Sequence, residues 1–440
     1  MSNIVLASGS DDGYSLTRSL RFRSSATAYL NRTPAAASNR TTWTWSGWVK
    51  RGKLGAYQSL FSAYGNSTNV DEQIRLYNSD VLNIEYYSTS SFVYQLLTTQ
   101  VFRDPAAWYH IVIAMDTTQA TASNRIKIYV NGTQVTSFST ATYPAQNTNT
   151  LVDGAFPHYL GVDANNGLNA YYDGYMAEVN FIDGQALAPT AFGAFSSYNQ
   201  WLPIKYAGTY GTNGFYLPFT NNASAATLGN DFSGNSNTWT TNNISVTAGS
   251  TYDSMTDVPT LTSATAANFA TLNPLSNDST NTLSAANLTY SIAANGNGYP
   301  TSTIQFSADK YYWECTVTST HNIIGIVLGT TGTTTQLFST GYGYYAVNGN
   351  KYVNGAASAY GSTYTSGDVI GVAVDMTALT ITFYKNNTSQ GAISIAAGLY
   401  KTAGGNGNST GVASGSYNFG QRPFAYTPPS GYLALNTYNL

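Results

Sequence analysis

The stretch that most constrains the fold runs from residue 364 to residue 391, with the sequence YTSGDVIGVAVDMTALTITFYKNNTSQG. Apolar residues occupy every second position on its first arm, 370–374, and again on its second arm, 379–383. Alternation of this kind is typical of a strand that buries one face. The stretch therefore predicts two strands that meet at a tight reversal.

A similar plan occurs earlier in the chain, in WYHIVIAMDTTQATASNRIKIYVNGTQV (residues 108–135). Its second arm alternates and ends in Asn131-Gly132. Asn-Gly after an alternating run is a strong signal for a two-residue hairpin turn, because both residues tolerate a positive φ. The chain thus contains two β-modules with a similar local plan.

Length and composition favour two folded domains. A single hydrophobic core stops growing at about 250–300 residues, and this chain has 440. Only 9% of its residues are charged, whereas it contains 36 Tyr and 40 Gly. This composition favours sheets that neutral polar side chains keep in solution. We therefore predict an all-β fold of two β-sandwich (jelly-roll) domains joined by an extended, ordered connector.

The charge pattern favours neutral partners. The formal net charge is −3 and Lys and Arg form no run, so the attraction that drives binding to nucleic acid or anionic membranes is missing. Cys315 is the only cysteine, so no intrachain disulfide is expected. The first residues lack the pattern of a signal peptide, and we expect synthesis in a cytoplasm and no insertion into a membrane.

The pattern of strands and turns divides the chain into four parts. These are an N-terminal arm (1–13), a first sandwich (14–205), the connector (206–267) and a second sandwich (268–440). In the first sandwich, Trp43 and Trp45 share one face of a strand and Trp48 takes the other. In the connector, Leu228, Trp239 and other apolar residues interrupt an Asn/Ser/Thr-rich sequence, which predicts packing along a domain.

Five motifs of the first module resemble the concanavalin A-like, laminin-G-type jelly rolls in order and spacing. They are WTWSGWVKR, WYHIVIAMD, RIKIYVNG, YLGVD and DGYMAEVNFIDGQALAPTAFG. The resemblance implies two packed antiparallel sheets, and members of the family often bind glycans and sometimes calcium.

The second module resembles the SPRY (B30.2) domain, another β-sandwich whose exposed loops bind partners. The resemblance rests on KYYWECTV, IIGIVLG, GYGYYAVNGNKYVNG, the hairpin described first, and YNFGQRPF. The pairing of the two modules and the ending NFGQRPFAYTPPSGYLALNTYNL resemble virion proteins of tailed bacteriophages. This second resemblance implies a place on the virion surface, contacts with other virion proteins and a homo-oligomer, by analogy a trimer.

No catalytic constellation is apparent. Glycoside hydrolysis needs a pair of carboxyl groups, and no Glu lies in an E-x-D-x-x-E arrangement. The chain has only four glutamates: Glu72, Glu85, Glu178 and Glu314. Glu178 and Glu314 lie within apolar strands, so we interpret both as structural carboxylates that are hydrogen-bonded inside a sandwich. No catalytic residue is assigned, and the protein is predicted not to be an enzyme.

The sequence offers no convincing metal site. His110, His158 and His321 are too far apart in the sequence to suggest a ligand set. His110 is predicted to be packed, and Cys315 is predicted to be a small buried hydrophobic residue. Calcium remains an alternative, because hard cations accept carboxylate and carbonyl oxygens. Its candidate ligands would be Asp153, Asp163, Asp173 and Asp183, although they match no family motif and no metal ligand or cofactor is assigned.

Aromatic residues in turn-rich segments provide the candidate binding site. An aromatic ring offers an apolar face to the C–H side of a sugar, and its hydroxyl can bond the rest. The candidates are Tyr342, Tyr344, Tyr345, Tyr352, Tyr360 and Tyr364 in the second module, with Tyr171 and Tyr172 in the first. The alternative is that these rings pack on strands or in subunit contacts.

These observations lead to three hypotheses about function. The first is a non-enzymatic virion adhesin, on a tail or head fibre, that binds host surface glycans. The second is a capsid decoration or tail structural protein that makes only protein contacts. The third, with the least support, is a polysaccharide-degrading enzyme.

Overall fold

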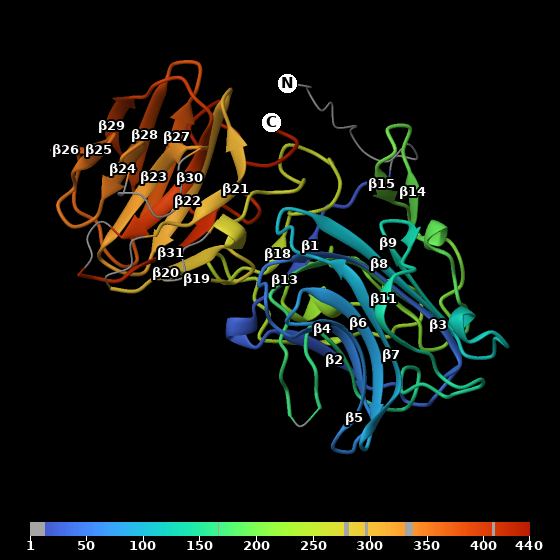
Figure 1. Ribbon diagram of the computed structural model, residues 1–440. Helices are drawn as coiled ribbons and strands as arrows, with labels where there is room; N and C mark the ends of the chain where they lie inside the picture. The colour runs from blue at the N-terminus through green and yellow to red at the C-terminus, as the bar shows by residue number, and fades with distance from the viewer. Residues whose placement is uncertain (1–13, 166, 277–280, 295–297, 331–337, 407–409) are drawn as a thin grey trace. The chain divides into compact units, whose positions relative to one another are not determined.

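The computed structural model describes residues 14–165, 167–276, 281–294, 298–330, 338–406 and 410–440, and its chain divides into two compact units (Figure 1). The first unit contains the chain up to Val246 together with Asp253–Thr262, and the second contains Thr247–Tyr252 and Ser263–Leu440. The predicted N-terminal arm, 1–13, lies outside the described residues.

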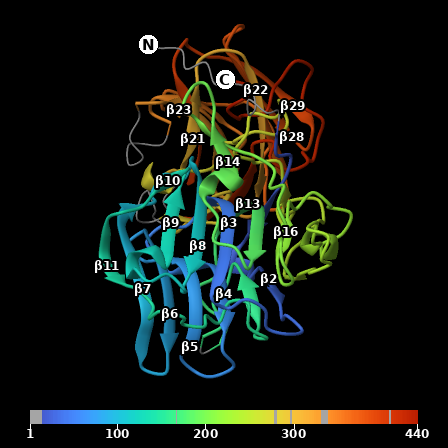
Figure 2. The ribbon, with the colours of Figure 1, turned by 90° about the vertical axis from the view of Figure 1, so that its right-hand side faces the viewer.

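The first unit is a sandwich of two eight-stranded antiparallel sheets, and Figure 2 labels several neighbouring strands of each sheet. Sheet 1 runs in the order β10 (Thr133–Gln134), β9 (Ile126–Val130), β8 (Trp108–Asp116), β3 (Thr42–Arg51), β13 (Gly174–Asp183), β1 (Ser19–Phe22) and β18 (Ser254–Met255), with β16 (Phe215–Leu217) also paired to β13. Sheet 2 runs in the order β11 (Phe138–Thr142), β7 (Ser91–Val101), β6 (Val81–Ser88), β5 (Val70–Leu76), β4 (Gln58–Tyr64), β12 (His158–Leu160), β2 (Tyr29–Arg32) and β17 (Thr240–Asn242). A separate pair is formed by β14 (Gly193–Phe195) and β15 (Trp201–Pro203).

The second unit is also a sandwich of two antiparallel sheets. Sheet 3 runs in the order β19 (Asn281–Ser284), β20 (Thr289–Ile292), β31 (Ala413–Asn418), β22 (Lys310–Val317), β27 (Val369–Asp375), β28 (Thr380–Lys385) and β29 (Thr388–Ser394). Sheet 4 runs in the order β21 (Thr301–Phe306), β30 (Tyr400–Asn406), β23 (Asn322–Leu328), β24 (Gly341–Tyr345), β25 (Lys351–Val353) and β26 (Ala356–Ser358).

The described residues contain no α-helix. Their only helical segments are the short 3-10 turns η1 (Ser24–Ala26), η2 (Ala122–Asn124), η3 (Pro189–Ala191), η4 (Ala226–Gly229) and η5 (Pro274–Ser276). None of these is long and apolar enough to cross a membrane. The predicted all-β fold with two β-sandwich domains is confirmed.

The two predicted hairpins form as expected. Val372 pairs with Phe383 across β27 and β28, although Leu379 belongs to the turn, with a φ of 54°, and not to the second strand. Asn131 and Gly132 have φ values of 47° and 78°, which is the left-handed region that a tight two-residue turn requires. Alternation therefore predicted the first reversal, and turn chemistry predicted the second.

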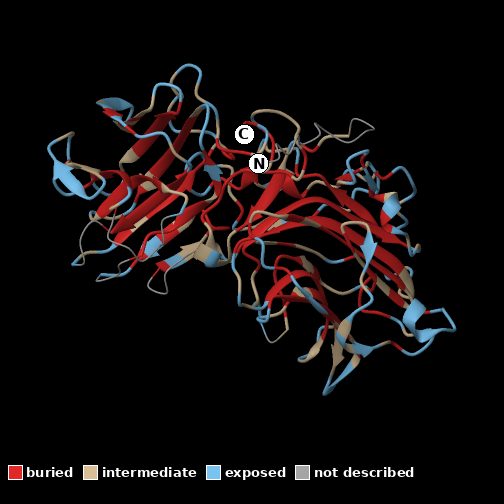
Figure 3. Cartoon of the chain, turned by 45° about the horizontal axis from the view of Figure 1, so that its top comes forward, coloured by how far each residue is buried: buried red, intermediate tan, exposed pale blue. Residues whose placement is uncertain are grey.

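The core of the first unit follows the strand alternation. Trp43 and Trp45 are buried in its main apolar cluster, whereas Trp48 lies on the opposite face of β3 and stacks on His110, with ring centroids 4.9 Å apart. Figure 3 shows the buried residues concentrated along the strands of each unit and the exposed ones on the loops. Each indole therefore takes the side of the strand that its position in the sequence predicts.

The predicted connector, 206–267, is ordered and contributes largely to the first sandwich. Its segments β16, β17 and β18 join sheets 1 and 2, and Leu228, Trp239 and Ile244 are buried in the first core. The apolar residues that interrupt this polar sequence thus identify strands and core contacts. The first unit consequently continues well beyond residue 205, where the sequence predicted its end.

Candidate functional site

Four of the six candidate tyrosines in the second unit are buried, which contradicts their role as a sugar-binding surface. Tyr342 and Tyr345 are each 4% exposed, Tyr364 is 3% exposed, and Tyr344 is completely buried. The Tyr364 hydroxyl donates to the backbone carbonyl of Tyr344 at 2.6 Å.

The cause of this burial is that both faces of β24 are covered. On one face, Tyr344 packs on Tyr364 and on Phe383 of sheet 3, with ring centroids 4.8 and 5.5 Å away. On the other face, Tyr345 belongs to a buried apolar cluster with Tyr299 and Phe338. Alternation in the sequence GYGYY therefore does not separate a covered face from an open one.

The remaining candidates do not meet at one place. Tyr172 is completely buried and its hydroxyl donates to the Lys50 carbonyl at 2.8 Å, which rules out a surface role for it as well. Tyr171, Tyr352 and Tyr360 are half-buried, but Tyr171 belongs to the first unit and the other two to the second. The predicted site is thus mostly core.

The candidate catalytic groups have structural partners. Burial lowers the pKa of His110 to about 3, and its Nδ1 accepts a hydrogen bond from Trp201 Nε1 at 3.0 Å. Burial raises the pKa of the Cys315 thiol to about 12. Glu314 accepts from the backbone amides of Ala425 and Tyr426 at 2.8 and 2.9 Å. The predictions of a packed histidine, a buried cysteine and a structural Glu314 are confirmed.

The four candidate calcium ligands are spread over different environments. Asp153 and Asp183 interact, and burial together with Asp183 raises the pKa of Asp153 to about 9. Asp173 instead accepts a hydrogen bond from the Ser24 hydroxyl at 2.8 Å. Within the described ranges, no three His, Cys, Asp or Glu side chains are grouped so that they would hold a metal ion.

The outward face of sheet 2 carries a row of polar side chains that crosses three strands. Gln73 on β5 pairs with Glu85 on β6, and Glu85 pairs with Gln95 on β7. The alternate residues of these strands, such as Ile74 and Ile84, are in the core. Because neighbouring side chains point to opposite faces, the polar row faces away from the core.

The row is tied together by hydrogen bonds and one ion pair. Glu85 Oε2 accepts from Asn83 Nδ2 at 2.7 Å and from Gln95 Nε2 at 3.2 Å, and Glu85 Oε1 forms an ion pair with Arg75. Burial raises the pKa of Glu85 even though Arg75 opposes the shift. Three buried atoms of the row, Gln73 Oε1, Arg75 Nε and Asn83 Oδ1, have no hydrogen-bond partner among the residues that the structure describes. These three atoms are buried within the row and do not reach solvent.

Two tyrosines lie at the end of this row and form, with Arg75, what we call the Tyr57–Tyr77 platform. The two rings meet edge to face, with centroids 4.9 Å apart, and the Arg75 guanidinium lies 5.4 Å from the Tyr57 ring and 4.8 Å from the Tyr77 ring. Tyr57 is 44% exposed, and the Tyr77 hydroxyl is within 3.3 Å of both Arg75 Nη2 and Gln95 Nε2. The platform thus combines an exposed ring with fixed polar groups.

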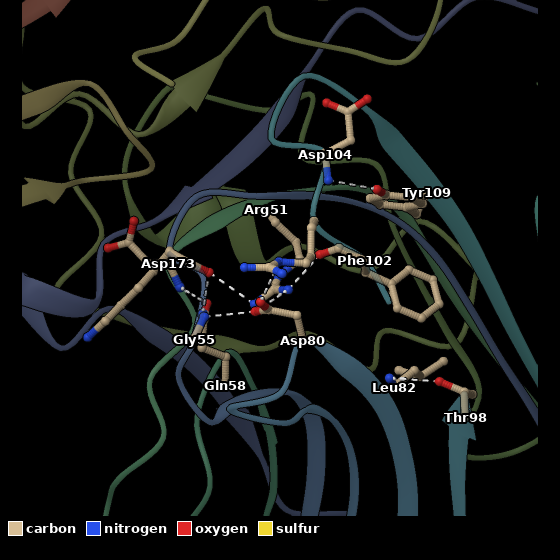
Figure 4. Close-up of polar contacts among 12 residues, drawn as sticks. Arg51, Gly55, Gln58, Asp80, Leu82, Thr98, Phe102, Asp104, Tyr109 and Asp173 are labelled. Carbon is tan, nitrogen blue, oxygen red and sulfur yellow. Dashed lines mark hydrogen bonds and ion pairs between the residues drawn. The ribbon is translucent and has the colours of Figure 1, made fainter. Parts of the chain in front are cut away.

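A buried ion pair, Arg51–Asp80, supports the loop that carries Tyr57 (Figure 4). Asp80 Oδ1 accepts from Arg51 Nη1 at 2.9 Å and from the Gly55 amide at 2.8 Å. Arg51 Nη2 and Gln58 Nε2 both donate to the Lys53 carbonyl, at 3.0 and 2.7 Å. Because Asp80 also donates its backbone N–H to the Tyr77 carbonyl, this network holds both tyrosines of the platform.

The Tyr57–Tyr77 platform was not predicted from the sequence, although the pattern of residues in β5 pointed to part of it. In VDEQIRLY, residues 70–77, Asp71, Gln73, Arg75 and Tyr77 occupy every second position, and Ile74 and Leu76 lie between the last three of them. That alternation indicates an outward polar face. The contribution of Tyr57 depends on the fold, since Tyr57 and Tyr77 meet only because β4 and β5 pair.

Comparison with known proteins identifies a domain in each unit. Residues 24–191 match the concanavalin A-like lectin/glucanases superfamily model Laminin_G_3, and residues 310–397 match the SPRY domain model. The chain therefore contains a concanavalin A-like domain and a SPRY domain. No curated protein matches it.

Solved structures of SPRY domains are similar to part of the chain. The SPRY domain of human HERC1 is 20% identical, with a TM-score of 0.27, and the match covers 30% of this chain and 87% of that one. The TRIM65 PSpry domain is 15% identical, with a TM-score of 0.29, and the match covers 34% of this chain and 92% of that one.

Proposed function

We propose that this protein is a non-enzymatic surface protein of a tailed-phage virion and that it binds host surface glycans through the Tyr57–Tyr77 platform. The platform carries the proposal. It offers an exposed ring for the C–H face of a sugar and, beside it, the amide of Gln95 and the guanidinium of Arg75 for sugar hydroxyls. The ion pair and the Arg51–Asp80 network hold these groups in place before a ligand arrives, which reduces the entropy cost of binding.

The rest of the chain supports this proposal. The low charge disfavours nucleic acid and anionic membranes and leaves neutral glycans as suitable ligands. The concanavalin A-like domain belongs to a superfamily described by its lectins and glucanases. The place on a phage particle rests on the resemblance of the sequence ending and of the domain pairing to virion proteins. Assembly as a homotrimer with other virion proteins rests on the same resemblance.

A binding experiment tests the platform. Purified protein is incubated with host cells and then released with a soluble saccharide. Tyr57→Ala is expected to weaken retention about tenfold, the typical value of one aromatic contact. Tyr198→Ala is the matched control, because Tyr198 is 68% exposed and lies in the same unit away from the platform. Equal retention of both variants would contradict the platform as the binding site.

Gold-labelled antibody on intact particles tests the place on the virion. Label at the distal ends of fibres supports host recognition. Label spread over the capsid favours the second hypothesis, in which the protein decorates the capsid and makes only protein contacts. No label at all contradicts the virion proposal.

One observation favours polysaccharide hydrolysis as a second candidate function. Asp71 and Glu85 lie on neighbouring strands of the same outward face, and burial raises the pKa of each carboxyl group. A carboxyl group with a raised pKa can serve as a general acid. Reducing ends released from host glycan by the native protein and lost with Glu85→Gln would establish this activity.

A further inference from the structure

A second place on the first unit combines a pocket, a carboxylate and exposed apolar surface, and it lies on sheet 1, away from the Tyr57–Tyr77 platform of sheet 2. The pocket has a volume of about 260 Å³. Its polar lining includes Tyr14, Glu178, Lys205 and Tyr216, and its apolar lining includes Pro218 and Phe232. We call it the Glu178 pocket.

The backbone of β13 turns the Glu178 side chain toward this pocket. The register between β13 and β3 shifts between Ala177 and Asn180, which is the mark of a β-bulge. Glu178 has a φ of 52°, a left-handed conformation that is uncommon for a residue with a side chain of this size. Bulges re-aim side chains and are enriched beside functional sites. Glu178 is 4% exposed and yet lines the pocket.

Two tyrosine hydroxyls hold the carboxylate. Tyr14 donates to Glu178 Oε1, Tyr216 donates to Glu178 Oε2 at 2.9 Å, and the two hydroxyl oxygens are 3.0 Å apart. Each carboxylate oxygen and each hydroxyl oxygen has more than one lone pair, so all four atoms can accept further hydrogen bonds. Burial raises the pKa of Glu178 to about 7, despite these two donors and the nearby Lys205 charge, which act in the opposite direction.

A pinned loop brings an exposed ring to the same pocket. The Phe232 backbone N–H donates to the Tyr216 carbonyl at 2.9 Å, and Asp231 Oδ1 accepts from the Tyr216 amide at 2.8 Å. Asp231 Oδ1 also accepts from the Ser233 amide at 2.8 Å, which closes the turn. Phe232 is nevertheless 49% exposed. The fold thus fixes the backbone of Phe232 and leaves its ring exposed in the pocket that Glu178 and Lys205 also line.

The size and chemistry of the pocket select the ligand. Sites for drug-sized molecules have volumes of about 300–1,000 Å³, so a pocket of 260 Å³ suits a smaller molecule. Above pH 7, where Glu178 is ionised, its carboxylate disfavours anions, and the charges of Lys205 and Arg18 disfavour cations. A ligand that both donates to Glu178 and accepts from Lys205, and that presents C–H groups to Phe232, is a neutral polyhydroxylated ring.

We infer that the Glu178 pocket binds a single neutral saccharide unit. The inference takes only the class of ligand, a glycan, from the proposed function. The pocket itself shares no residue with the platform. Glu178 and the two tyrosines accept from sugar hydroxyls, Lys205 donates to one, and Phe232 packs on the apolar face of the ring.

Saturation-transfer NMR tests the pocket with the methyl glycosides of glucose, galactose and N-acetylglucosamine, and with galacturonate as an anionic probe. At least one neutral glycoside is expected to bind, and Phe232→Ala is expected to weaken its binding about tenfold. Phe195→Ala is the matched control, since Phe195 is 51% exposed in the same unit and does not line the pocket. Lys205→Ala removes the proposed hydrogen-bond donor and leaves the buried residue Glu178 unchanged, so it tests whether Lys205 contributes to binding.

Three results would overturn the inference: no saturation transfer from any neutral glycoside, equal binding by Phe232→Ala and the native protein, or a preference for galacturonate. Glu178→Gln replaces an acceptor oxygen by a donor and is expected to weaken binding. If this variant does not fold, Phe232→Ala and Lys205→Ala are the decisive variants.

The two proposals fail separately. Retention on cells without monosaccharide binding overturns the pocket alone, and monosaccharide binding by a protein that cells do not retain overturns the platform alone.

Discussion

Both units contain a group of tyrosines, but the two groups have different surroundings. In the second unit, Tyr344 and Tyr364 pack on each other and on Phe383, inside the sandwich. In the first unit, Tyr57 and Tyr77 flank a guanidinium at the end of a polar row, and Tyr57 is 44% exposed. The difference shows that the density of tyrosines in a sequence says little about their accessibility. What decides it is whether a second layer covers the strand that carries them.

The largest effect is expected for Tyr364→Ala, which removes a buried ring and its hydrogen bond. Truncation of a buried aromatic residue costs about 3–5 kcal/mol, and we expect the second unit to lose about 4 kcal/mol of unfolding free energy. Cys315 is the only cysteine and is buried in this unit, so its rate of reaction with a thiol reagent in denaturant reports on unfolding.

The matched control for this variant is Tyr438→Ala, because Tyr438 lies in the same unit and is 46% exposed. If Tyr364→Ala lowered the unfolding free energy no more than Tyr438→Ala does, the contrast between the two groups of tyrosines would disappear.

A somewhat smaller effect is expected in the first unit for Asp80→Asn. This change leaves the buried Arg51 without its counter-charge, and breaking a buried pair costs about 3–5 kcal/mol. We expect the unfolding free energy to fall by about 3 kcal/mol, because Arg51 keeps the carbonyls of Phe102 and Lys53 as acceptors. Tryptophan fluorescence in denaturant measures this loss, since six of the seven tryptophans lie in the first unit.

Arg103→Met is the control for Asp80→Asn. Arg103 pairs with the same carboxylate at 3.1 Å, but its side chain is 58% exposed, so its loss is expected to cost less than about 1 kcal/mol. Equal effects of the two variants would mean that burial of Arg51 is unimportant for the loop that carries Tyr57.

The stability of the first unit is expected to depend on pH. Burial raises the pKa of Glu72, Asp163 and Glu178 to about 7 in the folded protein, above the usual value of about 4. Between these values the folded state binds protons that the unfolded chain has released, so the unfolding free energy falls as the pH rises from about 4 to about 7. Glu178→Gln is expected to reduce this fall by roughly 3 kcal/mol, as measured by denaturant titrations at several pH values. An unchanged pH profile in this variant would show that Glu178 is ionised throughout.

The smallest effect on stability is expected for Tyr57→Ala, which should change the unfolding free energy by less than about 0.5 kcal/mol. Tyr57 is 44% exposed and lies outside the core cluster of its unit. The same tryptophan fluorescence measures this change. A loss comparable with that of Tyr364→Ala would place Tyr57 among the core residues and remove the comparison between the two groups.

Much of the local structure could be predicted from the sequence. Alternation identified β27, β28 and β9, and Asn131-Gly132 identified the hairpin turn. The opposite faces of Trp45 and Trp48 also followed from their positions. These features are local, because the period of a strand and the conformations that a turn residue tolerates depend on a few neighbouring residues.

The binding surfaces could not be predicted in the same way. The sequence GYGYY placed Tyr344 and Tyr345 on opposite faces, but not under the layers that cover both. The Tyr57–Tyr77 platform needs the pairing of β4 with β5, and the Glu178 pocket needs segments that are far apart in the chain. The sequence by itself determined the all-β class, the strands and the tight turns, because these follow from residue type and spacing. Only the tertiary structure decided which tyrosines reach solvent, because accessibility depends on which strands and loops come to lie against each face.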